Sequence, residues 1–175
     1  ADALEQLTGK NVTAYSFGLR QAREGEAFVG LDEREYSLDP RAQVVTCHDL
    51  PIALAGVMGS KASGVTASTG RIWLESAMFS PASVRTTARS VGLRTDASAR
   101  FEKGLPREMT LACSIRALEL LKQLFPCEAM GLWVCGETSG DADVVLLRQD
   151  ALHQLLGPLV ADVVPAHVQL LDGLC

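Results

Sequence analysis

The chain has 175 residues, of which 47% are hydrophobic and 21% are charged, and its formal net charge is −5. These values lie near globular averages, so they exclude a chain that is disordered throughout, and the length suffices for one core that buries roughly 70% of the unfolded surface. No apolar run approaches the ~20 residues of a membrane-spanning helix and no signal peptide opens the chain, so we expect a cytoplasmic protein with no membrane partner.

The first 60 residues are expected to be mostly strands. Residues 1–8 have the pattern of a helix end, and residues 11–19 and 27–39 alternate apolar and polar side chains, as antiparallel strands do. Residues 43–47 and 52–58 are nearly continuous apolar runs, typical of strands covered on both faces. We expect a turn at Asp49-Leu50-Pro51 between them, because proline cannot continue a central strand.

The next 75 residues are expected to mix strands and helices. Residues 71–79 are a strand candidate, and Ser80-Pro81 then provides the cap and first residue of a helix that ends at Gly92. A second helix is predicted over 106–124, where leucine and isoleucine recur at helical spacing. Residues 129–135 are predicted to form one more strand.

The best linker lies between Gly136 and Asp143, a stretch rich in Gly, Ser, Thr and Asp. We therefore expect one unit over residues 1–138, and a linker with an incomplete second unit over residues 139–175.

Glu75 is the most unusual residue of the predicted strand over 71–79. Both faces of that strand are largely apolar, so burial on both sides is expected. A glutamate is almost never fully buried unless it is paired, and an unpaired buried charge costs several kcal/mol. Either a structural arginine or the hydroxyl of a ligand is expected to receive this carboxylate.

The sequence supports neither a metal site nor a protein nucleophile. The five cysteines are odd in number and form no C-x-x-C pair, so we expect reduced structural thiols. His48 and Asp49 are neighbours that a strand would point to opposite faces, and the other histidines, His153 and His167, lie in the second unit. Hydrolysis here would rely on a positioned water, and no catalytic residue is assigned.

The positive charge is concentrated in one stretch. Residues 81–107 contain six basic and two acidic residues, a net charge of +4, so the rest of the chain carries −9. Such a basic stretch on an acidic body is either a phosphate-facing patch or a solvated helix face. The candidates for contacts with nucleic acid are Arg85, Arg89, Arg94, Arg100 and Lys103.

Three motifs resemble one known family. They are Ala-Leu-Ala-Gly-Val-Met-Gly at 53–59, Leu-Glu-Ser-Ala-Met-Phe-Ser-Pro at 74–81, and Gly-Leu-Arg-Thr-Asp-Ala-Ser-Ala-Arg-Phe-Glu-Lys-Gly at 92–104. Together they are similar to the tRNA-editing domain of the β subunit of bacterial phenylalanyl-tRNA synthetase, in almost the whole chain. The resemblance implies a mixed α+β fold, with a β-sandwich-like core of unusual topology and flanking helices.

The resemblance also implies an activity, which is hydrolysis of tyrosine esterified to tRNA(Phe). The pocket residues of the family match Gly59, Glu75, Thr95 and Ala97, with the glutamate receiving the tyrosine hydroxyl. From the residues alone, Thr95 and Ala97 fit either a turn or the wall of a cavity.

The implied partners are tRNA(Phe) and a synthetase α subunit, in an α2β2 heterotetramer. ATP and Mg²⁺ are expected only at the active site of the α subunit, so no cofactor is expected in this chain. An editing-site histidine of the family precedes the position of Ala1, and residues 144–175 resemble the start of a winged-helix-like domain. We therefore expect an internal fragment of a longer subunit; the alternative is a non-catalytic, tRNA-binding and structural module of that subunit.

Overall fold

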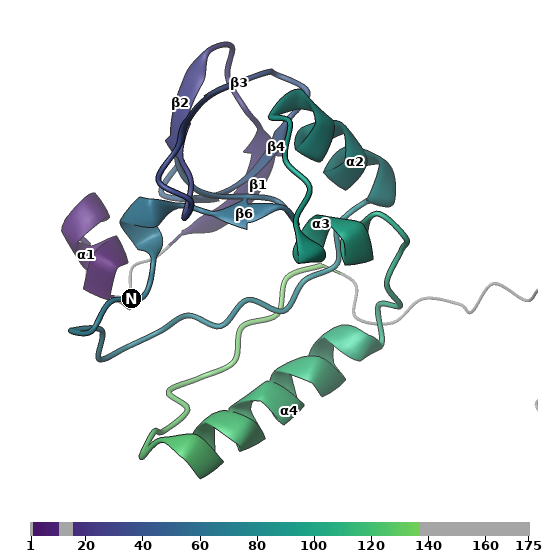
Figure 1. Ribbon diagram of the computed structural model, residues 1–175. Coiled ribbons are helices and arrows are strands. Elements are labelled where there is room, and N and C mark those ends of the chain that lie inside the picture. Colours follow the sequence, from purple (N-terminus) through teal and green to yellow (C-terminus); the bar gives the residue numbers. More distant parts are fainter. Residues whose placement is uncertain (1, 11–15, 137–175) are drawn as a thin grey trace, which may run out of the picture. The chain divides into compact units, whose positions relative to one another are not determined.

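Figure 1 shows the computed structural model of the chain, which describes residues 2–10 and 16–136. These residues belong to one compact unit, Ala1–Ser139. The predicted linker, the predicted boundary at 138/139, the second unit and its two histidines lie outside the described residues. Among the described helices, none combines the length and the apolar character that crossing a membrane requires.

Within the described residues, six short strands form two antiparallel sheets. In the larger sheet the order is β1 (Phe17–Gln21), β4 (Gln43–Cys47), β5 (Leu50–Leu54) and β6 (Met58–Gly59). The smaller sheet is the hairpin of β2 (Glu26–Val29) and β3 (Glu35–Leu38). The strands predicted over 27–39 and 43–47 are therefore confirmed, whereas 11–15 lie outside the described residues.

The turn between β4 and β5 differs from the prediction. It is formed by His48 and Asp49, which both have positive φ angles (47° and 69°), as the two-residue turn of a tight hairpin requires. Pro51 lies inside β5 and not in the turn. The strand accepts this proline because the register with β4 shifts between Val45 and Thr46, and strand prolines are confined to edges, ends and such irregularities.

The apolar run over 52–58 is likewise not one strand. It contains the end of β5, a turn and the start of β6. Gly56 occupies that turn with φ 68°, a backbone conformation that glycine adopts without steric cost. The backbone N–H of Val57 closes the turn by donating to the carbonyl of Leu54 at 2.9 Å.

The helices predicted within residues 2–10 and 16–136 are confirmed, and two more are present there. They are α1 (Asp2–Thr8), α2 (Pro81–Ser90) and α4 (Met109–Leu124), and α2 ends before Gly92, whose φ is 66°. The sequence did not predict α3 (Asp96–Phe101) or the short 3-10 helix η2 (Lys61–Ser63). The mixed α+β class is therefore confirmed.

The core lies where both sheets meet α2. Buried side chains come from β2 (Phe28), β3 (Leu38), β4 (Val44), β5 (Leu54) and α2 (Val84). Each such side chain stabilises the fold by roughly 1.5–3 kcal/mol relative to exposure.

A hydrogen bond fastens α2 to the larger sheet. The hydroxyl of Thr87, in α2, accepts a hydrogen bond of 2.9 Å from the backbone N–H of Gln43 at the start of β4. Thr87 is fully buried, so this bond satisfies a polar group that would otherwise be costly in the core.

The segment 71–79 is not a strand, and neither is 129–135. Within the described residues neither has a neighbour in a sheet, and without ladder hydrogen bonds an extended segment is not a strand. The predicted burial of 71–79 on both faces is also wrong, since Ile72 and Leu74 are 51% and 50% exposed.

Specific contacts nevertheless fix the course of 71–79. Arg71 forms ion pairs with Asp2 (2.9 Å) and Glu5 (2.6 Å) of α1. At the other end Phe79 is buried in the core, with its ring centroid 5.3 Å from that of Phe101 in α3. Between them, the hydroxyl of Ser76 donates to the carbonyl of Thr110 in α4 at 2.7 Å.

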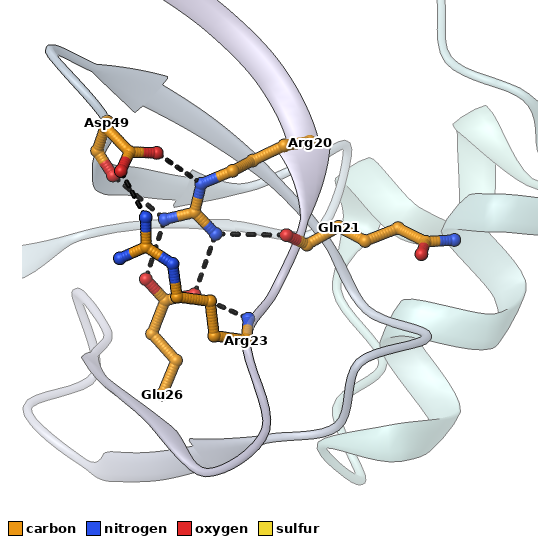
Figure 2. A network of polar contacts seen from close by, with 5 residues as sticks. All are labelled: Arg20, Gln21, Arg23, Glu26 and Asp49. Carbon is orange, nitrogen blue, oxygen red and sulfur yellow. Dashed lines mark hydrogen bonds and ion pairs between the residues drawn. The ribbon is translucent and has the colours of Figure 1, made fainter.

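An arginine ties the two sheets together, as Figure 2 shows. Arg20 of β1 donates to both carboxylate oxygens of Glu26 in β2, at 2.9 and 2.7 Å. It also donates to Asp49 in the β4–β5 turn, at 2.7 Å to the carboxylate and 2.8 Å to the carbonyl oxygen. Arg23 forms a second ion pair with Asp49. This network sets the position of the hairpin against the larger sheet.

Candidate functional site

Thr95 is positioned by the start of α3. Its hydroxyl accepts a hydrogen bond from the backbone N–H of Ser98 (3.1 Å), and the Ser98 hydroxyl accepts one from the N–H of Thr95 (2.9 Å). This reciprocal capping satisfies two backbone donors at the helix start. The Thr95 hydroxyl also donates to the carbonyl of Val57 at 2.8 Å, which attaches α3 to the turn between β5 and β6.

Gly59 lies next to that attachment. It follows Val57 by two residues and pairs with Ala53 across β5 and β6. A Cβ atom added at Gly59 would lie 3.1 Å from Cδ1 of Leu31, closer than most real contacts. Glycine therefore permits the close approach of Leu31, whose backbone N–H donates to the carbonyl of Gly59 at 3.0 Å.

The structure thus brings three of the four predicted pocket residues into one neighbourhood. Thr95 caps α3 and Ala97 lies exposed in its first turn, while Gly59 lies beside the turn to which Thr95 is bonded. The Thr95 hydroxyl is occupied by the backbone, so its shown role is to hold α3 in place. Ala97 has only a methyl side chain and Gly59 has no side chain, so both take up little space in this neighbourhood.

Glu75 lies apart from these three in the chain, four residues before the buried Phe79. It is exposed, so its predicted full burial is wrong. Surrounding protein nevertheless raises the pKa of the Glu75 carboxyl above its ordinary value by withdrawing water from it. The Glu75 side chain is therefore in contact with water, while nearby protein partly desolvates its carboxyl.

No arginine receives the Glu75 carboxylate within residues 2–10 and 16–136, and burial is the sole cause of its raised pKa. The sequence allowed for a structural arginine that pairs with Glu75, and the described part of the chain contains no such partner. A partly desolvated carboxyl with no charged neighbour among the described residues can accept a hydrogen bond from a donor group of a ligand.

The basic stretch divides into two groups in the structure. Arg85 and Arg89 of α2, with Arg94 of the α2–α3 turn, line one groove. Arg100 and Lys103 do not line it, although both are exposed. The sequence could not make this division, because all five cations lie within 19 residues of each other.

Metal ligation has no support within the described residues. They contain no group of three or more His, Cys, Asp or Glu side chains that could hold a metal ion. Cys47 is buried, which raises the pKa of its thiol, while Cys113, Cys127 and Cys135 are exposed. Asp49 is engaged by two arginines, so the acid–base pair with His48 that the sequence argued against has no geometric support either.

Two features of this region escaped the sequence analysis. The first is α3, although Thr95-x-x-Ser98 is a variant of the capping pattern that marks helix starts. The second is the role of Leu31, which packs on Gly59 from the β2–β3 turn. No local signal connects residues 28 positions apart.

Comparison with known proteins finds one matching domain family and several similar proteins. It matches the B3/4 domain family over residues 4–126. It is 86% identical over 159 residues to the "Phenylalanine--tRNA ligase beta subunit" of Parasynechococcus marenigrum, and 66% identical over 161 residues to the protein of that name from Synechococcus sp. (strain CC9605). These matches cover 91% and 92% of this chain but 20% of each relative, so the chain spans about a fifth of the length of these relatives.

Proposed function

The chain belongs to the B3/4 domain family, and from this premise we propose that it is part of the β subunit of a phenylalanine–tRNA ligase. In this role it hydrolyses tyrosine mischarged onto tRNA(Phe), and so supports accurate phenylalanyl-tRNA synthesis in the cytoplasm. Its partners are tRNA(Phe) and the ligase α subunit, in an α2β2 heterotetramer. ATP and Mg²⁺ act at the α-subunit active site, and this chain needs no cofactor of its own.

The observation that carries the proposal is the state of Glu75. Its carboxyl is partly desolvated and has no charged neighbour among the described residues, as its raised pKa reflects. When ionised, it accepts a hydrogen bond from the phenol O–H of tyrosine. A phenylalanine ring offers no donor, so it would desolvate the carboxylate further without any compensation.

A hydrogen bond to the tyrosine hydroxyl supplies a selectivity for tyrosine over phenylalanine that a hydrophobic pocket alone lacks. A pocket shaped for phenylalanine rejects the same ring with an added hydroxyl by only about 10²-fold. A site built on a hydrogen bond to that hydroxyl discriminates by ~10⁴ or more in the other direction. Gly59 lets Leu31 pack beside the β5–β6 turn, Ala97 adds only a methyl group to the first turn of α3, and Thr95 holds α3 against that turn.

The test compares deacylation of tyrosyl-tRNA(Phe) by the full-length protein and by its Glu75→Ala variant. A hydrogen bond to a charged group contributes about 1.5–3 kcal/mol, so we expect the rate constant to fall roughly 10- to 150-fold. Glu24→Ala, which removes an exposed carboxylate from a turn, is the control and is expected to deacylate normally. Unchanged hydrolysis in Glu75→Ala, with phenylalanyl-tRNA still spared, would remove Glu75 from this role.

The alternative function is a non-catalytic module that binds tRNA and supports the subunit. The exposure of Glu75 favours it, since water can reach the carboxylate that the editing role needs to be desolvated. Under this alternative, neither the wild type nor the Glu75→Ala and Glu24→Ala variants deacylate tyrosyl-tRNA(Phe) above the uncatalysed rate.

A further inference from the structure

A shallow groove of about 500 Å³ lies between α2 and α3. Figure 1 shows these two helices joined by a short connection. The basic lining of the groove comes from Arg85 and Arg89 on α2 and from Arg94 in the connection between the helices. Three arginines from two successive segments therefore line one open space.

The positive charge of this groove is only weakly neutralised. Among the residues that the structure describes, Glu102 is the single acid in the lining. Its carboxylate lies 3.8 Å from Arg94 Nη2, at the outer limit of an ion pair, and the Arg94 side chain is 81% exposed. Arg85 donates a long hydrogen bond of 3.3 Å to the carbonyl of Glu102, which leaves its charge unpaired. The lining thus keeps a net positive charge.

The rest of the lining consists of the half-buried Leu93 and three small residues. Ala88 and Ser98 are buried there, and Gly92 has no heavy atom within 4 Å of the position a Cβ would take. Small-molecule pockets are mostly apolar and enclose their ligand. An open groove lined by basic residues is typical of surfaces along which a nucleic acid backbone runs.

We infer that this groove binds the phosphate backbone of an RNA strand, with Arg85, Arg89 and Arg94 as the contacts. The inference rests on the proposed function, because the RNA it needs is the tRNA that a phenylalanine–tRNA ligase uses. Of the five basic residues that the sequence offers as contacts with nucleic acid, the inference selects the three that line the groove. Arginine suits this role, since its planar fork of donors matches two phosphate oxygens at once.

The experiment measures binding of a fluorescent tRNA(Phe) transcript to the full-length protein between about 50 and 300 mM salt. Each phosphate contact contributes roughly 0.7–0.9 to the slope of log K against log salt. We therefore expect each of Arg85→Gln, Arg89→Gln and Arg94→Gln to lower the slope by about that amount, and the triple variant by about 2. The affinity loss is expected to be largest at low salt.

A control variant separates local contacts from general charge. Arg34→Gln combined with Arg116→Gln removes two exposed cations outside the groove, and neither the affinity nor the slope is expected to change beyond a small uniform effect. Glu102→Gln removes the only acid in the lining, so we expect tRNA to bind a few-fold more tightly. Melting temperatures check that all variants are folded.

Several results would overturn the inference. If the triple variant binds with the affinity and slope of the wild type, the groove is not the RNA contact, even where Glu75→Ala loses deacylation. Saturable binding of inorganic phosphate that the triple variant loses would assign the groove to a free anion. Binding of an acidic peptide in competition with tRNA would assign it to a protein. If the wild-type protein neither binds tRNA(Phe) nor deacylates tyrosyl-tRNA(Phe), the proposed function itself fails.

Discussion

Replacing Arg20 with methionine tests whether the network in Figure 2 holds the β2–β3 hairpin against the larger sheet. Arg20 donates two hydrogen bonds to the carboxylate of Glu26, two to Asp49 and one to the carbonyl of Gln21. The side chains of Arg20 and Glu26 are only 22% and 12% exposed, so water compensates poorly for the loss of their pairing. Methionine keeps most of the apolar stem and removes the charge.

The magnitude follows from the state of Glu26 after the substitution. Its carboxylate keeps one of its hydrogen bonds, from the backbone N–H of Arg23 at 2.9 Å. Hydrogen bonds to charged groups contribute about 1.5–3 kcal/mol, while loss of one partner of a fully buried pair costs about 3–5 kcal/mol. Since this pair keeps some contact with water, we expect a loss of about 1.5–3 kcal/mol. This corresponds to a fall in Tm of roughly 5–10 °C.

The assay is thermal and urea unfolding of the full chain at pH 7, with Arg41→Met as the matched control. Arg41 also donates two hydrogen bonds to one carboxylate, that of Asp39, at 2.9 and 2.7 Å. Its partner is only two residues away and its side chain is 74% exposed. Exposed local pairs contribute little, so Arg41→Met is expected to change Tm much less.

The dependence on pH provides a second readout. The hydrogen bonds from Arg20 are the largest cause that lowers the pKa of Glu26, and Arg20 also lowers the pKa of Asp49. A lowered folded pKa gives stability that is present above the ordinary carboxyl pKa and is lost as the pH falls through the folded value. The penalty of Arg20→Met should therefore shrink between pH 7 and pH 3. A penalty no larger than that of Arg41→Met, or equal at both pH values, would refute the reasoning.

Two further predictions concern the core turn and Glu75. In Gly56→Ala, the added Cβ meets Val84 Cγ2 at 2.9 Å and Phe79 Cδ2 at 3.1 Å, whereas Gly92→Ala has a similar positive φ but no atom within 4 Å. We expect unfolding experiments to give a loss of about 1–2 kcal/mol for Gly92→Ala and about 1–3 kcal/mol more for Gly56→Ala; equal losses would contradict the packing argument. Because burial raises the folded pKa of Glu75, its ionisation costs stability as the pH rises through that value. The advantage of Glu75→Gln over the wild type, measured by urea unfolding from about pH 4 to pH 8, should therefore grow with pH, and a constant difference would show that the carboxyl is fully hydrated.

Local signals in the sequence were enough for most of the regular structure. Ser80-Pro81 and Gly92 delimit α2 because proline suits the first turn of a helix and glycine adopts the positive φ beyond its end. The strand Gln43–Cys47 matches its prediction residue for residue, since a short apolar run of β-branched residues favours a covered strand.

Local signals failed where a partner distant in the chain decides the structure. Residues 71–79 have the composition of a strand, but a strand exists only where a neighbour supplies its hydrogen bonds, and none does within the described residues. Pro51 enters β5 because the register with β4 shifts beside it, which is a property of the pair of strands.

The candidate site divides in the same way. The sequence by itself determined the family resemblance, the isolated acid at Glu75 and the basic stretch, because these depend on residue type and order. Only the tertiary structure decided that Thr95 joins α3 to the β5–β6 turn, and that Arg85, Arg89 and Arg94 share a groove which Arg100 and Lys103 do not line. The physical reason is that the chemistry of a side chain depends only on the residue type. Which side chains lie near one another, and which are in contact with water, depends on how the helices and strands pack.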